Sequence, residues 1–473
     1  MQRRKHRSLG ENKSHNESFK YIKLYFLYLK KYNLFVSCIP RKYYFCEMKD
    51  EFKEILSDFN EWTLPDIIKR EIDVPVNSGK IITLIGPRRS GKSYCLLYLI
   101  KQLLKKRIQK KQIVYVNFED ERLEIKASDL DDLLKAQREL YPGIDLSSCY
   151  FFFDEIQNIT GWDKFVRRCY DSISKHVFIT GSNATLLSTE IASSLRGRTL
   201  TYELLTLSFK EYLTFKGIAT NKQDSASKAD VNRALKTYLN EGGFPEIVLG
   251  KPSSRVKVLQ EYFNVMLYRD LIQRYKFTNL DIVRFFLKRN LAANCSYLSL
   301  NKVYLDLRSQ GYKLDKNLLY QVNEAAKAVY LTMNIKKFDY SELKSLKSDS
   351  KTYCVDNGLL SATTFNFDSE ITRLFENAIF LHYRRTQTPM FYYKNGKECD
   401  FVIYNQKKKQ WLPVQACYDM RKHLTFEREV AGLVSCCKAL NIKAGLIVTM
   451  FEEREIIKDS IKISIVKLVD FLS

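Results

Sequence analysis

One octapeptide constrains the fold of this chain more than any other feature. Residues 86–93 read GPRRSGKS and fit the phosphate-binding pattern G-x-x-x-x-G-K-[ST]. The apolar run Ile81–Ile85 precedes the octapeptide and suits a buried parallel strand, and the residues after Lys92 have the apolar spacing of a helix. A strand, a glycine loop and a helix in this order predict an α/β fold built on a parallel sheet.

The same loop predicts a site for ATP and Mg²⁺. Its backbone N–H groups and the start of the following helix can cradle phosphates, Lys92 can reach the β and γ phosphates, and the Ser93 hydroxyl can bind Mg²⁺. For the two arginines of the loop, contact with phosphate and a solvated loop charge are equally open. The predicted nucleotide-binding residues are Gly86, Pro87, Arg88, Arg89, Ser90, Gly91, Lys92, Ser93 and Tyr94.

Two further apolar segments end in carboxylates. Residues 113–118 read IVYVNF and are followed by two acids, and residues 149–153 read CYFFF and are followed by Asp154 and Glu155. Ligands bind beyond the carboxyl ends of parallel strands. We therefore expect Asp154 to support Mg²⁺ through water and Glu155 to polarise the water that attacks the γ phosphate. A strand that simply ends in solvated acids is the alternative.

Two more catalytic candidates follow the strand expected at His176–Thr180. Asn183 can hydrogen-bond the γ phosphate or the attacking water, although asparagine also suits turns and helix caps. Arg198 can reach the nucleotide of a neighbouring subunit as an arginine finger, serve its own site or form a salt bridge. The finger role requires a homo-oligomer. The four catalytic candidates are Lys92, Glu155, Asn183 and Arg198.

Five segments in this order resemble a family of prokaryotic AAA-type ATPases with a C-terminal domain of unknown function. They read GPRRSGKS, YFFFDEIQNITGW, FITGSNATLL, LRGRT with LSFKEYL, and EGGFPEIV. The resemblance covers about Asn60 to Ser473. It implies a P-loop nucleoside triphosphatase core of the AAA type, a helical lid, a winged-helix-like middle and an α/β domain similar to restriction endonucleases. The expected activity is ATP hydrolysis that drives a switch or motor.

The domain boundaries combine this resemblance with the helical spacing. We expect the ATPase core at residues 48–215, the lid at 216–275, the winged-helix-like domain at 276–345 and the endonuclease-like domain at 346–473. The lid pattern is broken by the glycines and proline of GGFP at residues 242–245, which must interrupt a helix. Arg269 lies on its last helix, where packing or solvation is favoured over phosphate contact.

The sequence of the middle domain does not identify the class of partner that the domain binds. Helix starts are expected at Ser299 and Asp315, and residues 328–335 form a strand-like apolar run. This order is compatible with a winged helix, a common DNA-binding form. The expected reading helix, Leu318–Val329, carries only Lys327 as a cation that could reach bases. Protein contact or a plain scaffold is therefore at least as well supported as DNA recognition.

The endonuclease resemblance implies a metal-dependent nuclease pattern that this chain matches incompletely. Glu376, Asp400 and Gln415 stand at the three metal-side positions, but Cys417 stands where a lysine is expected. Without that lysine, we expect no cation to position the attacking water, and Gln415 removes a negative metal ligand. We favour a binding platform that has lost its chemistry. An ATP-gated, Mg²⁺-dependent nuclease and a protein adaptor with little ATP turnover are the alternatives.

The charge balance bears on partners. The chain has 77 Lys and Arg against 54 Asp and Glu, a net charge of +23, so an anionic partner has to be considered. Residues 1–47 contribute +8 of this charge and the rest contributes +15. We expect residues 1–47 to be an upstream extension outside the native fold; a basic segment on a membrane surface or along nucleic acid is the alternative. Nucleic acid thus remains a candidate partner without strong support.

The cysteines and the hydropathy pattern bear on the compartment. The 11 cysteines include no Cys-x-x-Cys pair and are odd in number. They indicate buried, reduced thiols of a cytoplasmic protein. No uninterrupted apolar run reaches the length of about 18 residues that a membrane-spanning helix needs.

Overall fold

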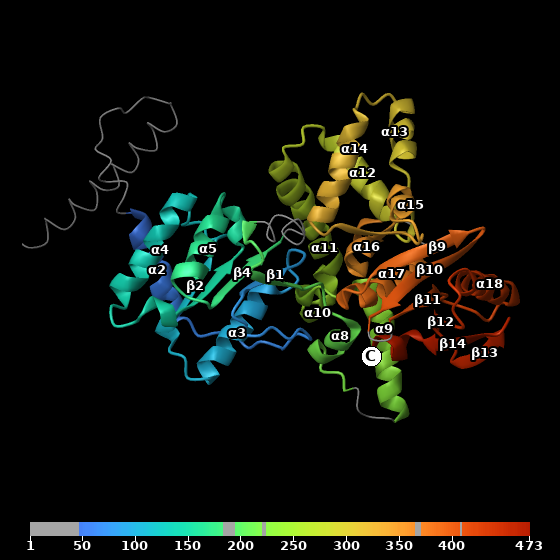
Figure 1. Cartoon of the computed structure of the whole chain (residues 1–473), viewed down its shortest axis with the longest axis horizontal. Helices are drawn as coiled ribbons and strands as arrows, with labels where there is room; N and C mark the ends of the chain where they lie inside the picture. The colour runs from blue at the N-terminus through green and yellow to red at the C-terminus, as the bar shows by residue number, and fades with distance from the viewer. Residues whose placement is uncertain (1–46, 183–193, 220–223, 365–369, 407–408) are drawn as a thin grey trace, which may run out of the picture.

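The computed structural model describes residues 47–182, 194–219, 224–364, 370–406 and 409–473. Figure 1 shows two bodies side by side, one built on a sheet from the first half of the chain and the other on a sheet from the second half. Two predictions fall outside the described residues: the candidate Asn183 and, apart from Glu47, the extension at residues 1–47.

The first sheet is parallel, as the sequence predicts. Its five strands are β1 (Ile81–Ile85), β2 (Ile113–Asn117), β3 (Tyr150–Asp154), β4 (Val177–Gly181) and β5 (Thr199–Glu203), in the order β2-β3-β4-β1-β5. Every residue of β1, β3 and β4 is buried, which their continuous apolar runs allow. Because the strands are parallel, the segments after β1 and β3 leave at the same edge.

Helices cover both faces of the first sheet. One core joins the sheet to α2 (Glu47–Glu61), α4 (Leu130–Leu140) and α5 (Trp162–Ser172). The other core joins it to α3 (Lys92–Lys105) and to residues 64–76, which precede β1. Alternate side chains of a strand point to opposite faces, so β1, β2, β3 and β4 each contribute to both cores.

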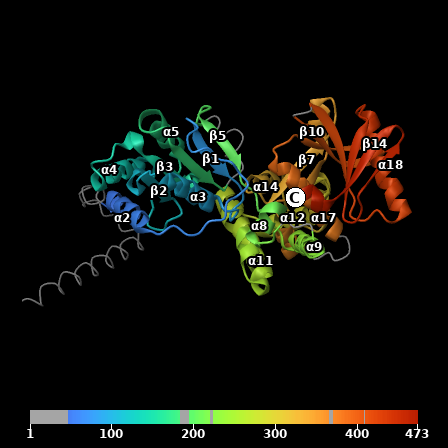
Figure 2. The same ribbon diagram turned by 90° about the horizontal axis from the view of Figure 1, so that it is seen from below.

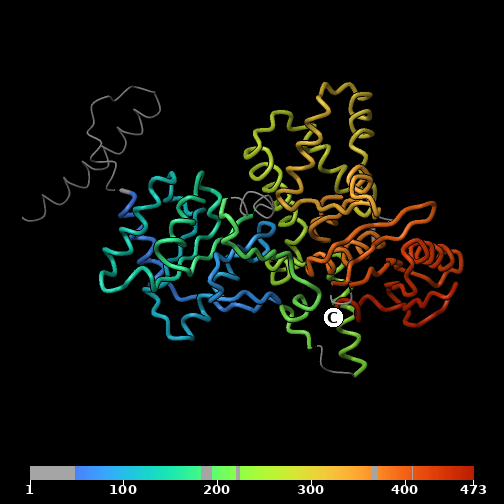
Figure 3. Tube along the Cα trace, in the orientation of Figure 1, coloured from blue at the N-terminus to red at the C-terminus, as the bar shows by residue number. Residues whose placement is uncertain are grey.

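A helical region follows the first sheet, and the chain passes into it at residues 204–208 (Figure 3). The GGFP segment separates α9 from α10 as predicted, and Pro245 takes the first position of α10, where its missing N–H costs no helical hydrogen bond. Figure 2 shows α8, α9 and α11 between the two sheets. The bounds are α8 (Phe209–Phe215), α9 (Ser225–Glu241), α10 (Pro245–Leu249), α11 (Arg255–Val265), a π-helix (Met266–Gln273) and α12 (Leu280–Ala292).

The second sheet has nine strands in the order β13-β14-β12-β11-β10-β9-β7-β8-β6 and mixes parallel with antiparallel pairs. It runs across the expected boundary between residues 345 and 346, because β7 pairs with both β8 and β9. The strands are β6 (Ser296–Leu298), β7 (Thr332–Lys337), β8 (Ser350–Cys354), β9 (Met390–Asn395), β10 (Lys397–Asn405), β11 (Gln410–Ala416), β12 (Ala444–Thr449), β13 (Arg454–Lys458) and β14 (Ile461–Lys467).

The helices around the second sheet begin mostly where the sequence predicts. Side chains of Ser299 and Asp315 cap α13 and α14. Asp356 lies between β8 and α16, and its carboxylate accepts hydrogen bonds from two backbone N–H groups and caps α16. The helices are α13 (Leu300–Ser309), α14 (Lys316–Ala328), α15 (Glu342–Lys347), α16 (Asn357–Thr363), α17 (Glu370–Arg385), α18 (His423–Ala439) and α19 (Leu468–Leu472).

The membrane and thiol expectations are met within the described residues. In that part of the chain, no helix combines the length and the apolar character needed to cross a bilayer. Its cysteines are free thiols and are all buried.

Glycines bring the helical region against α16. The Gly243 N–H donates to Asp356 Oδ2 at 2.8 Å. A Cβ added at Gly242 would lie 1.9 Å from Asp356 Oδ1, and one added at Gly358 would lie 2.1 Å from the Glu241 carbonyl oxygen. Side chains at these two glycines would therefore force the segments apart.

We expect Gly242→Ala to lower the urea midpoint of unfolding more than Gly217→Ala does. Both glycines have a positive φ, 74° and 66°, but a Cβ at Gly217 would meet nothing within 4 Å. The control therefore carries only the left-handed backbone cost of about 1–2 kcal/mol, whereas Gly242→Ala also displaces the Asp356 carboxylate. Urea titration followed by circular dichroism measures both. Equal midpoints would show that the close approach does not stabilise the fold.

Candidate functional site

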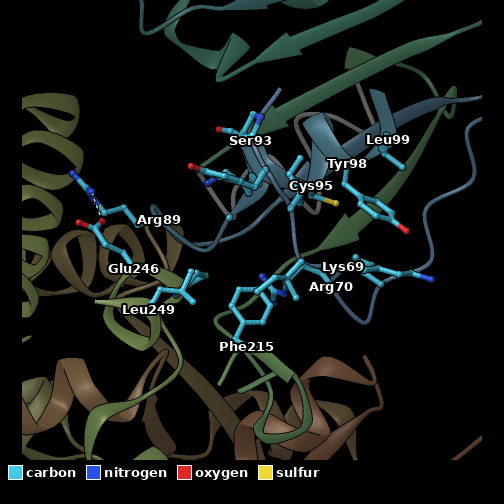
Figure 4. A pocket seen from close by; sticks show the side chains of 18 of the residues that line it. Lys69, Arg70, Arg89, Ser93, Cys95, Tyr98, Leu99, Phe215, Glu246 and Leu249 are labelled. Atoms are coloured by element: carbon cyan, nitrogen blue, oxygen red, sulfur yellow. Dashed lines mark hydrogen bonds and ion pairs between the residues drawn. The ribbon is translucent and has the colours of Figure 1, made fainter. Parts of the chain in front are cut away.

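A cavity of about 860 Å³ lies between the first sheet and the helical region. Its lining comes from residues 65–74, the phosphate-binding loop, the start of α3, the ends of β2 and β3, and parts of α8 and α10. In Figure 4, Ser93 and Tyr98 border one side of this space, and Phe215 and Leu249 border the other. The cavity is thus lined by side chains of the first body and of the helical region.

The glycines of the loop permit its tight path beside the sheet. Gly86 has a φ of 152°, and a Cβ there would lie 2.1 Å from the Leu204 carbonyl oxygen. Gly91 has a φ of 96° and directly precedes α3. Both positions favour glycine for steric and conformational reasons. The N-terminus of α3, with its free N–H groups, therefore faces the cavity as an anion site.

Lys92 is the first residue of α3 and is only 4% exposed. Its ammonium donates to the carbonyl oxygens of Gly86 and Pro87 at 3.2 and 3.1 Å. It also lies 3.3 Å from Glu155 Oε1. The two residues predicted to act on the γ phosphate therefore form a buried ion pair with each other.

Asp154 is fully buried at the end of β3 and is surrounded by hydroxyl groups. Tyr115 donates to its Oδ2 at 3.1 Å, Thr180 donates to its Oδ1, and Ser93 also hydrogen-bonds to it. Burial raises the pKa of Asp154, and the Ser93 and Thr180 bonds oppose that rise. The structure thus places together the two residues predicted to lie on the metal side, Ser93 and Asp154.

This donor set fits an Mg²⁺ ion that arrives with a nucleotide. Mg²⁺ is usually held by one or two protein oxygens and completes its octahedron with water and phosphate oxygens. The Ser93 hydroxyl and the Asp154 carboxylate are such a pair. Across the described residues, no group of three or more His, Cys, Asp or Glu is arranged to hold a metal by itself.

Glu155 stands in the left-handed region, with a φ of 53°, and its side chain turns toward Lys92. Its N–H donates to Thr180 Oγ1 at 2.8 Å, and Gln157 Nε2 donates to its Oε2 at 2.6 Å. Burial pushes the pKa of Glu155 up, but the charge of Lys92 and the bond from Gln157 outweigh it, so the pKa is lowered. The Glu155 carboxylate is therefore ionised and able to accept a proton from water.

Arg88 forms ion pairs within the protein. Its guanidinium contacts Glu119, which follows β2, at 3.0 Å and Asp270 of the π-helix at 3.2 Å. Arg269 lies 3.2 Å from the same Glu119 carboxylate. The loop is thereby tied to the helical region, and Arg269 reaches the rim of the site while remaining half exposed.

The other polar loop residues differ in their surroundings. Arg89 pairs with Glu246 at 2.7 Å and lies 4.8 Å above the Tyr262 ring, so both loop arginines are engaged by the helical region. The Ser90 hydroxyl is buried and has no hydrogen-bond partner. The Tyr94 side chain is 56% exposed at the cavity rim.

Arg70 is an important residue of the site that no sequence motif marks. It is 9% exposed and pairs with Glu211 of α8, which is 5% exposed, at 2.7 Å. Its guanidinium also donates to the carbonyl oxygens of Ser90, in the phosphate loop, and Leu205, where the chain leaves the sheet. One side chain therefore connects the loop, the segment before β1 and the helical region.

The sequence analysis also missed the apolar part of the cavity wall. Its residues come from four separate segments and show no periodic pattern, so only the tertiary structure brings them together. The residues are Ile67, Ile68, Ile72, Val74, Tyr98, Leu99, Phe215 and Leu249.

Arg198 lies apart from the cavity. Its carbonyl oxygen accepts from the N–H of Ile81, at the amino end of β1, and its side chain pairs with Asp171 at 2.8 Å. The phosphate loop begins at the other end of β1, about 16 Å away for five residues of strand. Arg198 therefore does not serve the site of its own chain.

The nuclease-type residues meet in the second sheet around a lysine that the sequence interpretation overlooked. Lys351 on β8 is 2% exposed, and its ammonium lies 2.9 Å from Glu376, 3.1 Å from Glu398 and 2.8 Å from Asp400. The expectation that no cation would be placed there is wrong. Lys351 lies 49 residues before Asp400, so the local motif gave no sign of it.

Gln415 and Cys417 lie on the other side of Asp400. The Gln415 amide accepts from the Asp400 N–H at 3.2 Å and donates to Glu429. Cys417 is buried, and desolvation raises the pKa of its thiol to about 12, so it remains a neutral thiol. It supplies no charge to the cluster.

Two family models match the chain. One describes an AAA domain and matches residues 78–213, and the other describes a domain of unknown function (DUF8612) and matches residues 232–370. The first includes the phosphate loop and both β3 carboxylates. The resemblance to AAA-type ATPases is thereby confirmed, and the winged-helix-like and endonuclease-like characters of the later domains remain predictions.

Two solved structures illustrate more distant likeness. The Walker-type ATPase PABY2304 of Pyrococcus abyssi is 15% identical, with a TM-score of 0.39, over 67% of this chain and 95% of that one. The Aeropyrum pernix Orc1 protein, solved in complex with DNA, is 10% identical, with a TM-score of 0.29, over 68% and 91%. At these scores, neither likeness says what this chain binds.

Two curated relatives cover most of the chain. An uncharacterized protein of Haemophilus influenzae is 28% identical over 344 residues, 72% of this chain and 83% of the relative. The uncharacterized protein MJ1544 of Methanocaldococcus jannaschii is 34% identical over 402 residues, 83% of this chain and 86% of the relative. The chain therefore belongs to this family of AAA-type Walker ATPases, in which a domain of unknown function follows the AAA domain.

Proposed function

We propose that the protein hydrolyses ATP and acts as a nucleotide-driven switch or motor. The observation that carries this proposal is that Lys92 and Glu155 line one cavity at the end of a parallel sheet, with Asp154 buried next to Glu155. The α3 N-terminus supplies an anion site beside them. The cavity volume of about 860 Å³ falls within the range typical of ligand sites.

In this proposal each residue has one role. The loop N–H groups and Lys92 bind the phosphates, and Lys92 leaves its pairing with Glu155 to do so. Ser93 and Asp154 hold Mg²⁺, which neutralises charge on the phosphates when bound. Glu155, ionised in its buried position, orients the attacking water and accepts its proton. Asn183 is kept as a candidate for contact with the γ phosphate.

Residues 204–208, here called the hinge, connect the first sheet to the helical region. Contacts at the hinge support transmission of the nucleotide state to the second body. Arg70 joins the phosphate loop to α8 through Glu211. From the second body, Arg384 pairs with Glu203 at the end of β5, and Arg385 donates to the carbonyl oxygen of Thr206 at 3.0 Å. A change in the phosphate loop therefore reaches the hinge, which is bonded to side chains from both bodies. We infer that closure of the helical region moves the second body.

The partner of the second body is open between nucleic acid and protein. On α14, Lys327 is paired with Glu324, so the one cation expected to reach bases is already engaged. This favours a protein partner or a scaffold role over sequence-specific DNA recognition. Arg198, which faces away from its own site, suits a role at the nucleotide of a second copy in a homo-oligomer. An adaptor with little ATP turnover is the alternative to the motor.

A metal-dependent nuclease is the other candidate function. Lys351 supplies the cation that the sequence motif lacked, but its pairing with all three carboxylates weighs against entry of a metal. The ammonium already lies within 3.1 Å of all three carboxylates of its cluster. A divalent cation would have to enter beside a buried positive charge, at a high electrostatic cost. We propose that the cluster stabilises the second body and cuts no DNA.

We expect Lys92→Ala to lower ATP turnover about 10²- to 10³-fold and to weaken ATP binding, because the phosphates lose their buried cation. Lys101→Ala is the matched control: Lys101 lies on the same helix and pairs with exposed Asp66 at 3.7 Å. Phosphate release and binding of a fluorescent ATP analogue measure the two effects. Unchanged turnover in Lys92→Ala would refute the site assignment.

We expect Glu155→Gln to bind ATP but to lose turnover about 10²- to 10⁴-fold, because the amide cannot accept a proton from water. Glu121 is exposed, so the control variant Glu121→Gln should behave as wild type. Single-turnover hydrolysis and equilibrium binding separate the two steps. If Glu155→Gln hydrolyses ATP normally, Glu155 is not the base.

For the second body, we expect no cleavage of linear or supercoiled DNA in Mg²⁺ or Mn²⁺, with or without ATP. Mn²⁺ should also leave the melting temperature of the nucleotide-free protein unchanged. A metal bound at the cluster would raise it, because a bound ligand stabilises the folded state. Gel assays and calorimetry test both points. Mn²⁺-dependent cutting that Asp400→Ala abolishes would establish the nuclease instead.

A further inference from the structure

Each carboxylate oxygen of Glu155 has its own partner. Oε1 lies 3.3 Å from the Lys92 ammonium, and Oε2 accepts a hydrogen bond from Gln157 Nε2 at 2.6 Å. Lys92 is the residue that phosphates attract, whereas Gln157 is a neutral side chain on the same turn as Glu155. The two contacts will therefore respond differently to a nucleotide.

The turn that carries Gln157 is well anchored. Glu155 is held through its N–H by Thr180, and Ile156 begins a short 3₁₀ turn with its side chain 1% exposed in the core. On the far side, the Asn158 amide donates to the Phe118 carbonyl oxygen at 3.4 Å. The direction in which Gln157 leaves the backbone is thus set by its neighbours.

The Gln157 amide has unused capacity beside the carboxylate. Its Oε1 is buried and has no hydrogen-bond partner, and its Nε2 lies 3.5 Å from Ser182 Oγ at the end of β4. A buried carbonyl oxygen without a partner costs free energy unless a donor fills the place. A water molecule next to Glu155 is a donor of suitable size.

We propose that Gln157 is the positioning residue for Glu155, holding Oε2 so that Oε1 becomes free to activate water when phosphates draw Lys92 away. This inference rests on the proposed ATP hydrolysis. Before nucleotide binds, Lys92 occupies Oε1 and keeps the carboxylate inactive. After binding, the Gln157 bond remains and prevents the carboxylate from rotating, and the free Gln157 oxygen accepts the second hydrogen of the water.

The test compares Gln157→Leu and Gln157→Glu with Asn158→Ala. Both Gln157 variants keep a side chain of similar size but lack the donor, and Glu adds a like charge next to Glu155. We expect kcat to fall about 10- to 100-fold, which corresponds to the free energy of one hydrogen bond to a charged group. The KM for ATP should be nearly unchanged. Asn158→Ala, on the same turn, should retain kcat.

The outcomes separate this inference from the proposed function. If Glu155→Gln abolishes turnover while both Gln157 variants match wild type in kcat and in the KM for ATP, Gln157 does not position the base. If Glu155→Gln itself turns over normally, the proposed hydrolysis mechanism fails first. Equal losses in Asn158→Ala and Gln157→Leu would show a structural effect of the turn and overturn the inference. ADP binding, measured for every variant, confirms that each is folded.

Discussion

Burial of charge at the carboxyl ends of β1 and β3 is the constraint on which the site depends. Lys92, Asp154 and Glu155 are each at most 8% exposed. An unpaired ion at such depth costs several kcal/mol, so every one of these groups needs a partner. Without nucleotide the partners are the protein's own: Lys92 and Glu155 pair, and hydroxyls surround Asp154. A phosphate that recruits Lys92 must therefore change the state of Glu155 as well.

The same requirement explains how the two bodies are joined. Arg70 is nearly buried, and it is satisfied by Glu211 and by carbonyl oxygens from the phosphate loop and the hinge. Arg384 and Arg385 meet the hinge from the other body. These side chains lose bonds if either body moves alone, because each reaches across a boundary. The hinge is thus bonded to side chains on both sides of it.

The sequence predicted those parts of the fold whose signals are local. The loop 86–93, the β3 carboxylates, the GGFP break and the Ser299 cap each depend on a few neighbouring residues, and the structure has them where expected. Contacts made over long separations were beyond reach. Arg70 meets Glu211 across 141 positions and Lys351 meets Asp400 across 49, and no periodicity marks either residue. The extent of the second sheet was missed for the same reason, since β7 and β9 pair across an expected boundary.

Lys351 also shows how an acidic cluster can balance its charge without a metal. Glu376, Glu398 and Asp400 bring three negative charges to one ammonium. Burial raises the pKa of Glu376 against the opposing pull of Lys351. Lys394, 3.7 Å from the more exposed Glu398, supplies a further positive charge. The two lysines thus offset most of the negative charge of the three carboxylates.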